Sequence, residues 1–303
     1  MNNITYNSVL IIGMGLIGSS IARAINEKKI ANKIYGLDNN KTTIKKTKNL
    51  QIVEDIYENL EDISLQFDLI FICVPLSSYK NIFKKLNNFI KEPTLITDVG
   101  STKVSVINDY KSLIDNNKIS FLPAHPIAGL EKSGPEHGFA KLFYNRYCII
   151  TPIYSDKKLI EAISNIWKSF GMTVEIMDAE RHDRVLAMTS HIPQLIAYSV
   201  VGTATELETQ MKDEVIKYSA AGFRDFTRLA GSDPIMWRDV YEKNKEAVLE
   251  MLSLFSEDLL TYQKAIKNND LKFLEEKFSK SKDIRKIIEE IGQAGTFDPT
   301  EKN

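Results

Sequence analysis

The sequence has little of several features that define special classes of protein. Its 303 residues include two cysteines and four histidines, and 39 basic side chains are balanced by 40 acidic ones, for a formal net charge of −1. Both cysteines lie in apolar runs, Cys73 in LIFICVP and Cys148 in RYCIITP, which argues against a disulfide framework and predicts free buried thiols. Without a basic excess, binding to nucleic acid or to a membrane surface is not expected, and a small-molecule partner is favoured.

Long apolar runs and targeting segments are also missing. No stretch approaches the roughly 18 apolar residues of a membrane span, and the N-terminus lacks the basic and apolar parts of a secretory signal. No spacing of cysteine and histidine matches a zinc site, since His182 and His191 are nine positions apart, so no metal is expected. We therefore expect a cytoplasmic protein without a membrane segment.

The first half of the chain alternates apolar runs with amphipathic segments of helical period. The runs lack strict alternation, as expected for strands that are covered on both faces, and this pattern predicts a doubly wound parallel sheet. The predicted strands lie within residues 8–13, 33–38, 67–75, 93–101 and 119–126, with two more within 146–152 and 172–178.

The pattern changes after Asp178, from where the chain is helical in period and has almost no strand-like run. The length suits two domains. We expect an α/β Rossmann-type domain at residues 1–177 and an all-helical domain at residues 178–303. The last segment, residues 293–303, is typical of a short disordered tail.

The motif GMGLIG, residues 13–18, joins the first predicted strand to the first predicted helix. Gly13 permits a tight turn, Gly15 lets the backbone approach a pyrophosphate, and Gly18 lets the helix pack closely on the strand. Asp38 ends the second strand 20 residues after Gly18, where an acid binds a ribose 2′-hydroxyl and repels a 2′-phosphate. This combination predicts NAD as cofactor, bound by a group of residues that also includes Met14, Leu16 and Ile17. Glycines that only form a turn are the alternative, and the following NNK leaves NADP open.

Three further strand ends carry candidate residues, because ligands in such sheets bind beyond the carboxyl ends of the strands. Val74 and Pro75 follow one strand, and Asp98 follows the next; we predict contacts of all three with the cofactor. Ser101 could be catalytic or only a helix cap. His125 could be a core histidine, but at a strand end it is a reasonable general base near neutral pH.

A second cluster lies in the helical part. His191 and Gln194 belong to the stretch TSHIPQ, whose proline favours a kink. Arg224 and Arg228 are four apart with Asp225 alongside, which is usual for a solvated face. The flanking apolar residues favour partial burial instead, and a buried guanidinium suits a carboxylate.

These motifs together resemble those of the prephenate dehydrogenases, a family that includes arogenate and cyclohexadienyl dehydrogenases. The glycine motif, DVGSTK, HPIAGLEKSG, TSHIP and the stretch from GFRDFTR to SDPIMWRD occur in that family's order and spacing, to about residue 260. The resemblance implies a Rossmann-type domain joined to a helical dimerisation domain. It also implies a homodimer that catalyses the NAD-dependent oxidative decarboxylation of prephenate to 4-hydroxyphenylpyruvate in tyrosine biosynthesis.

By that resemblance, His125 corresponds to the catalytic histidine and Ser101 to the serine beside it. Arg228 corresponds to the arginine that binds the substrate's ring carboxylate. Further residues match substrate-binding positions, namely Glu131, His191, Arg224 and Asp225.

One departure from the family concerns Gln194, which by the resemblance occupies a substrate-binding position that contacts the substrate's side chain. Many relatives have a second histidine there, SHLPH as against SHIPQ in this chain. Glutamine can donate and accept hydrogen bonds but cannot become cationic. Arogenate or broad cyclohexadienyl specificity is therefore an open alternative, as is feedback inhibition, and the family's optional regulatory domains have no counterpart here. A β-hydroxyacid dehydrogenase and a non-catalytic NAD sensor are more distant alternatives.

Overall fold

The structure is a computed structural model, and it describes residues 6–130, 132–206, 214 and 217–291. The chain forms two compact units, Met1–Val248 and Leu249–Asn303. The tail expected at residues 293–303 lies outside the described residues.

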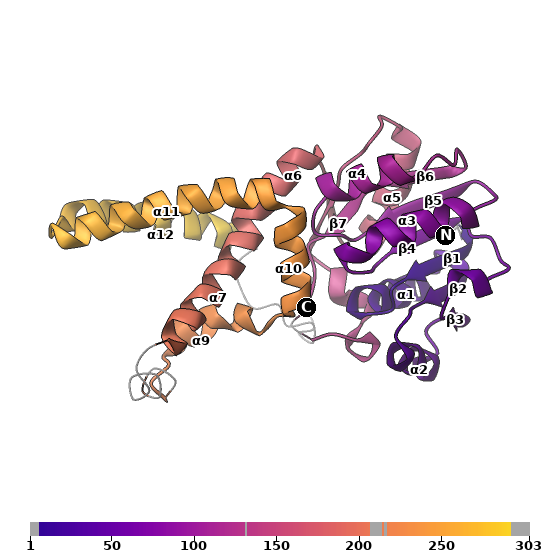
Figure 1. Ribbon diagram of the computed structural model, residues 1–303, viewed down its shortest axis with the longest axis horizontal. Helices are drawn as coiled ribbons and strands as arrows, with labels where there is room; N and C mark the ends of the chain where they lie inside the picture. Colours follow the sequence, from indigo (N-terminus) through magenta and orange to yellow (C-terminus); the bar gives the residue numbers. More distant parts are fainter. Residues whose placement is uncertain (1–5, 131, 207–213, 215–216, 292–303) are drawn as a thin grey trace. The chain divides into compact units, whose positions relative to one another are not determined.

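Six parallel strands form the main sheet, as the uninterrupted apolar runs predict (Figure 1). Their order is β3-β2-β1-β4-β5-β6, so β2 and β3 lie on one side of β1 and β4 to β6 lie on the other. The strands are β1 (Tyr6–Ile12), β2 (Ala31–Leu37), β3 (Asp55–Tyr57), β4 (Leu69–Ile72), β5 (Thr94–Asp98) and β6 (Ile119–Leu122). The sequence analysis missed β3, because its three residues contain no apolar run.

Helices cover both faces of this sheet. Val9 and Ile11 of β1 lie in one core cluster with Trp167, whereas Leu10 and Ile12 lie in another with Phe83. This alternation follows from the strand period of two, and it makes both faces of β1 buried. The helices are α1 (Leu16–Lys28), α2 (Lys41–Leu50), α3 (Tyr79–Phe89), α4 (Val104–Leu113) and α5 (Lys157–Ser169), with short helices η1 (Leu60–Asp62), η2 (Leu76–Ser78), η3 (Pro135–His137) and η4 (Ala140–Phe143).

A second, three-stranded sheet corrects the prediction of one strand over residues 119–126. The chain leaves the main sheet after β6, and residues Ala124–Pro126 form β7, which pairs antiparallel with β8 (Tyr147–Ile150). Pro123 causes the break, because proline has no N–H for a sheet ladder; its carbonyl accepts from the N–H of Thr151. β9 (Thr173–Ile176) pairs parallel with β8.

All the regular secondary structure that is described beyond β9 is helical, as predicted. Its elements are α6 (Ala179–Leu186), η5 (Ala187–His191), α7 (Ile192–Thr205), α9 (Ala221–Thr227), η6 (Arg228–Gly231), α10 (Pro234–Lys243), α11 (Lys245–Lys267) and α12 (Leu271–Glu290). The parallel sheet followed by this helical part confirms the predicted fold class.

The elements α6, η5 and α7 form one continuous helix, Ala179–Thr205, which contains a turn of π-helix at Ala187–His191. Pro193 stands at the start of α7, where its missing N–H interrupts the regular hydrogen-bond pattern, and the π turn directly precedes it. By length and composition alone this helix could cross a membrane, which contradicts the expectation that no stretch comes near that length. Such evidence is weak, because a core helix of a soluble protein passes the same test, and His182, Asp183 and His191 of this helix are buried inside the protein.

The unit Leu249–Asn303 contains the rest of α11 and all of α12. Tyr262 of α11 packs on Phe273 and Phe278 of α12. Several large apolar side chains on α12 remain exposed, namely Leu271, Phe278, Ile284 and Ile287.

Candidate active site

The glycine turn between β1 and α1 has the form that a dinucleotide needs. Gly13 has φ +96°, and a Cβ there would meet the carbonyl oxygen of Cys73 at 2.5 Å. A Cβ on Gly18 would meet the carbonyl oxygen of Gly13 at 1.9 Å, so only glycine lets α1 start this close to β1. At Gly15, which caps α1, a Cβ would meet nothing within 4 Å. Open space thus faces the positive end of α1, where an anion binds favourably.

Asp38 is tied to this turn by hydrogen bonds. Its Oδ2 accepts from the backbone N–H of Met14 at 2.8 Å, and its Oδ1 accepts from the backbone N–H of Asn40 at 2.9 Å. The carboxylate is only partly buried, so its remaining lone pairs can accept from a ribose. Val74 lies beside Gly13, and Pro75 precedes η2. The turn, the acid and the neighbouring loop therefore fit a dinucleotide.

The other predicted cofactor residue, Asp98, has a different environment. Its side chain is completely buried, and its Oδ1 accepts from the N–H of Ala124 at 3.0 Å. Its Oδ2 accepts from the Tyr79 hydroxyl, the Gly100 N–H and the Lys103 ammonium at 2.9, 2.9 and 2.6 Å. Because four protein groups donate hydrogen bonds to this carboxylate, it is not available to a cofactor. Asp98 therefore has a structural role in place of the predicted cofactor contact.

Lys103 shares this structural role and lies close to the histidines of the site. Its side chain is fully buried, and its Nζ also donates to the carbonyl oxygen of Ala124 at 2.8 Å. Burial lowers the pKa of Lys103, and the attraction of Asp98 opposes that shift. The ammonium thereby connects the end of β5 to β7, the strand that carries His125.

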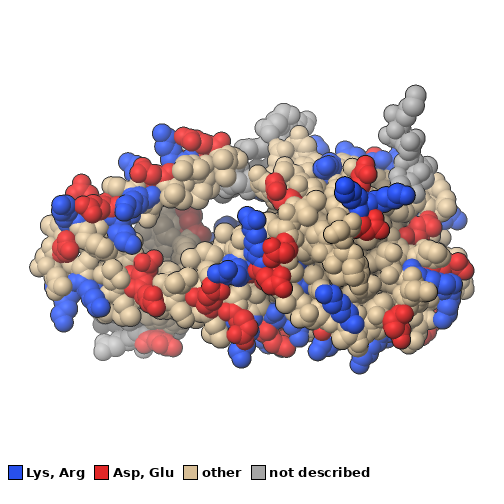
Figure 2. Space-filling model, turned by 90° about the horizontal axis from the view of Figure 1, so that it is seen from above, with Lys and Arg blue, Asp and Glu red and all other residues tan. Residues whose placement is uncertain are grey.

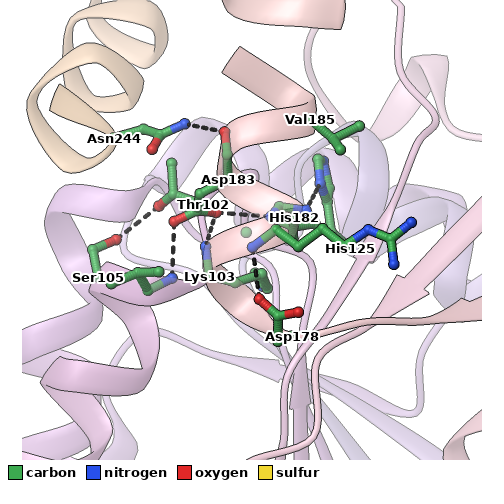
Figure 3. A network of polar contacts seen from close by, with 12 residues as sticks. Thr102, Lys103, Ser105, His125, Asp178, His182, Asp183, Val185 and Asn244 are labelled. Carbon is green, nitrogen blue, oxygen red and sulfur yellow. Dashed lines mark hydrogen bonds and ion pairs between the residues drawn. The ribbon is translucent and has the colours of Figure 1, made fainter. Parts of the chain in front are cut away.

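His125 lies in the middle of β7, opposite Ile149 of β8, and is half-buried. Its Nδ1 is 2.9 Å from Nε2 of His182 on α6, and Nδ1 of His182 is 2.7 Å from Oδ1 of Asp183 (Figure 3). Ser101 is also half-buried, but in the described part of the chain no hydrogen bond joins it to His125.

Both histidines of this contact are held in the neutral form. Burial lowers the pKa of His125 well below the usual 6.5, and the nearby His182, Lys103 and His191 lower it further. Burial also lowers the pKa of His182, although the hydrogen bond with Asp183 opposes the shift. A neutral imidazole can accept a proton or a hydrogen bond, which is the state that a general base requires.

His191 occupies the end of the π turn and is almost completely buried. The amide nitrogen of Asn244 contacts both the backbone oxygen of Asp183, at 2.9 Å, and Nδ1 of His191, at 3.1 Å. The backbone oxygen of Asp183 can only accept a hydrogen bond, so the Asn244 atom that faces it belongs to the NH₂ group. This NH₂ group also donates to Nδ1 of His191, which is therefore an acceptor. Burial lowers the pKa of His191 to about 4.

The remaining predicted residues lie around η6. Gln194 is buried, and its Nε2 donates to the backbone oxygen of Leu229 at 2.7 Å, so α7 is fastened to η6 directly after Arg228. Arg224, Asp225 and Arg228 are exposed, which differs from the partial burial that the flanking apolar residues predicted; the seven-residue helix α9 has no buried residue. Glu131 lies outside the described residues.

Four residues of the site escaped the sequence analysis: His182, Asp183, Lys103 and Asn244. His182 was considered only as a metal ligand, and within the described part of the chain no three His, Cys, Asp or Glu side chains gather as a metal site requires. The pair His182–Asp183 lies 57 residues after His125, and no local spacing indicates their contact. The adjacent histidine and aspartate were the one available signal.

The parallel sheet, the glycine turn and the acid at the end of β2 define a dinucleotide-binding protein of the Rossmann class. Comparison with known families identifies the chain further. Residues 21–176 match the model described as "Prephenate dehydrogenase, nucleotide-binding domain", and residues 178–280 match "Prephenate dehydrogenase, dimerization domain". The chain belongs to the prephenate dehydrogenase family of oxidoreductases, which confirms the resemblance seen in its motifs.

Individual relatives agree with this assignment. The chain is 34% identical to a cyclohexadienyl dehydrogenase of Zymomonas mobilis over 92% of this chain and 95% of the relative, and 31% identical to a prephenate dehydrogenase of Bacillus subtilis over 92% and 75%. Among solved structures, prephenate dehydrogenase from A. aeolicus in complex with hydroxyphenyl propionate and NAD+ has a TM-score of 0.87 and 33% identity, over 93% of this chain and 98% of that one. An arogenate dehydrogenase from Synechocystis, at 22% identity and a TM-score of 0.77, shares the fold.

Proposed function

We propose that the protein catalyses the NAD-dependent oxidative decarboxylation of prephenate to 4-hydroxyphenylpyruvate, a reaction of tyrosine biosynthesis. The observation that carries this proposal is the neutral His125, held on β7 in a chain whose solved relative binds hydroxyphenyl propionate and NAD+. The two family models, which together span residues 21–280 apart from one residue, support the same reaction class.

The residues that hold the cofactor are the glycine turn, with its open face at Gly15, and Asp38. When bound, NAD supplies the hydride acceptor of the reaction. The carboxylate of Asp38 accepts from the ribose hydroxyls and repels a 2′-phosphate, and for this reason we propose NAD rather than NADP. The backbone of residues 13–18 supplies the N–H groups for the pyrophosphate.

His125 acts on the ring hydroxyl. In the proposed complex, the neutral imidazole accepts the hydrogen bond of the 4-hydroxyl group and stabilises the positive charge that develops on carbon 4 as this carbon loses a hydride. Loss of carbon dioxide then makes the ring aromatic, which drives the reaction without an acid or a metal. Ser101 orients the hydroxyl, and Arg228 binds the ring carboxylate, which fixes the face of the ring that is presented.

The substrate's side chain is the point on which prephenate and arogenate differ. Arogenate or broad cyclohexadienyl activity is the second candidate, favoured by the relative from Zymomonas mobilis and by the uncharged Gln194. The amide nitrogen of Gln194 is already committed to Leu229, which leaves its oxygen as the free group. A bare amide oxygen suits the amino group of arogenate, whereas Arg224 and His191 suit a keto acid.

The test uses purified protein with prephenate or arogenate, each with NAD or NADP, and follows the absorbance of the reduced cofactor. We expect the highest kcat/KM with prephenate and NAD. His125→Asn should abolish turnover while NAD affinity is retained, and His137→Asn, at a partly exposed histidine, is the matched control. Full turnover by the His125 variant would contradict the mechanism and would favour a non-catalytic NAD sensor.

We further propose that the protein is a cytoplasmic homodimer. The match of residues 178–280 to a dimerisation domain supports the dimer, as do the exposed apolar side chains of α12. Charges of both signs are interspersed over the face shown in Figure 2, with no broad basic surface for nucleic acid there. Light scattering coupled to gel filtration measures the mass; a chain of 34.4 kDa should elute at twice that mass.

A further inference from the structure

The contact between His125 and His182 determines which ring nitrogen of each carries a proton. Nδ1 of His182 faces Oδ1 of Asp183 at 2.7 Å, and a carboxylate only accepts hydrogen bonds. His182 is fully buried and burial lowers its pKa, so it is neutral and has one proton. That proton is on Nδ1, and its Nε2 is a bare acceptor.

The tautomer of His182 in turn determines the tautomer of His125. Nε2 of His182 lies 2.9 Å from Nδ1 of His125, and a bare nitrogen requires a donor. His125 is also neutral, since burial and its neighbours lower its pKa. Its single proton is therefore on Nδ1, and Nε2 is left as the acceptor.

Asp183 accepts two backbone hydrogen bonds at a helix terminus. Its Oδ1 accepts from the backbone N–H of Lys103 at 2.8 Å, and its Oδ2 accepts from that of Val104 at 3.0 Å. These two groups open α4, where the helix dipole stabilises a negative charge. A reversed order of donors would set the lone pair of His182 Nδ1 against this carboxylate and leave buried polar groups unpaired, which is unfavourable.

We propose that His182, oriented by Asp183, is a positioning residue that fixes the proton of His125 on Nδ1 and so presents Nε2 to the substrate. The predicted effect on turnover rests on the proposed function, whereas the assignment of the ring proton to Nδ1 of His125 does not. In solution a free imidazole favours the proton on Nε2, so the protein imposes the less common form at the position where the chemistry needs a bare Nε2.

The experiment is nitrogen-15 NMR of the full-length protein with labelled histidine. Four histidines give four imidazoles, which single His→Gln variants assign. Long-range proton–nitrogen couplings distinguish Nδ1–H from Nε2–H rings. We expect the Nδ1–H form for His125 in the unmodified protein, measured without substrate.

Two variants separate positioning from mere packing. His182→Gln keeps a donor toward Asp183 and an acceptor toward His125, and it should retain the Nδ1–H form and most of the turnover. His182→Phe fills the space with a ring that has neither nitrogen, and it should shift His125 toward Nε2–H. With it, kcat should fall about a hundredfold to a thousandfold, within the usual contribution of acid–base groups, with KM for NAD unchanged. His137→Phe is the matched control, and circular dichroism confirms folding.

The outcomes distinguish this inference from the proposed function. An Nε2–H ring at position 125 of the unmodified protein overturns the inference, whatever substrate is turned over. Equal kcat values for the Phe and Gln variants at position 182 also overturn it. Conversely, an Nδ1–H ring in a protein that does not oxidise prephenate supports the inference and refutes the proposed function.

Discussion

Acid should destabilise the fold through His191, and the size of the effect follows from its environment. Burial lowers the pKa of His191 from 6.5 to about 4. Between these two values the unfolded chain binds a proton that the folded chain does not, so the stability conferred by neutral His191 is present above pH 6.5 and is lost as the pH falls toward 4. At about pH 5 the loss amounts to about 2 kcal/mol relative to about pH 7.5.

The comparison that isolates this effect is His191→Asn, whose Oδ1 can still accept from Asn244. Urea denaturation at one protein concentration gives the free energy of unfolding at the two pH values. The unmodified protein should lose about 2 kcal/mol more between them than the His191 variant does. His137→Asn, at a partly exposed histidine, should lose as much as the unmodified protein. Equal losses in the unmodified protein and the His191 variant would refute the reasoning.

Three further predictions concern the glycine turn, the buried ion pair and the pH dependence of turnover. Gly18→Ala should cost about 2 kcal/mol of stability or more and weaken NAD binding, because its Cβ would meet the oxygen of Gly13 at 1.9 Å. Urea denaturation measures the stability and titration with NAD measures the affinity. Unchanged values for both would contradict the packing argument. Lys103→Met should destabilise the folded protein by about 3–5 kcal/mol, and adding Asp98→Asn should recover part of that loss. A double variant that is no more stable than the Lys103 variant would argue against a buried ion pair. In pH–rate profiles, kcat/KM should stay level as the pH falls through 6.5 and decline only at lower pH. The reason is that burial lowers the pKa of His125 and the neutral imidazole is the active form. A decline in kcat/KM with its midpoint at pH 6.5 or above would exclude this histidine as the group that titrates.

The sequence was most informative where burial leaves a continuous apolar run. The strands of the main sheet other than β3 could be located because both of their faces are covered, and the glycine turn could be located because it lies between such a strand and a helix. β3 has three residues and one buried side chain, so it produces no comparable pattern. The break at Pro123 was visible as a residue, but its consequence, a second sheet, depends on pairing with β8.

Side-chain contacts over long sequence separations could not be predicted from spacing. Asp98 follows a strand at the edge where ligands bind, yet its partners Tyr79 and Lys103 enclose it completely. In the same way, the environment of His125 depends on His182, which comes 57 residues later. The resemblance to a family supplied the role of His125, whereas only the structure shows which residues surround its ring.

The position of His182 and Asp183 on α6 affects how the protein can be divided. Residues 1–177 contain the whole glycine turn and Asp38, but they lack the helix that carries His182 and Asp183, to which we attribute the placement of the ring proton at position 125. A fragment ending there would retain the groups that bind a nucleotide, and its histidine would be free to exchange between two tautomers. The groups that fit a nucleotide thus lie within residues 1–177, whereas the contacts around the ring of His125 also require His182 and Asp183.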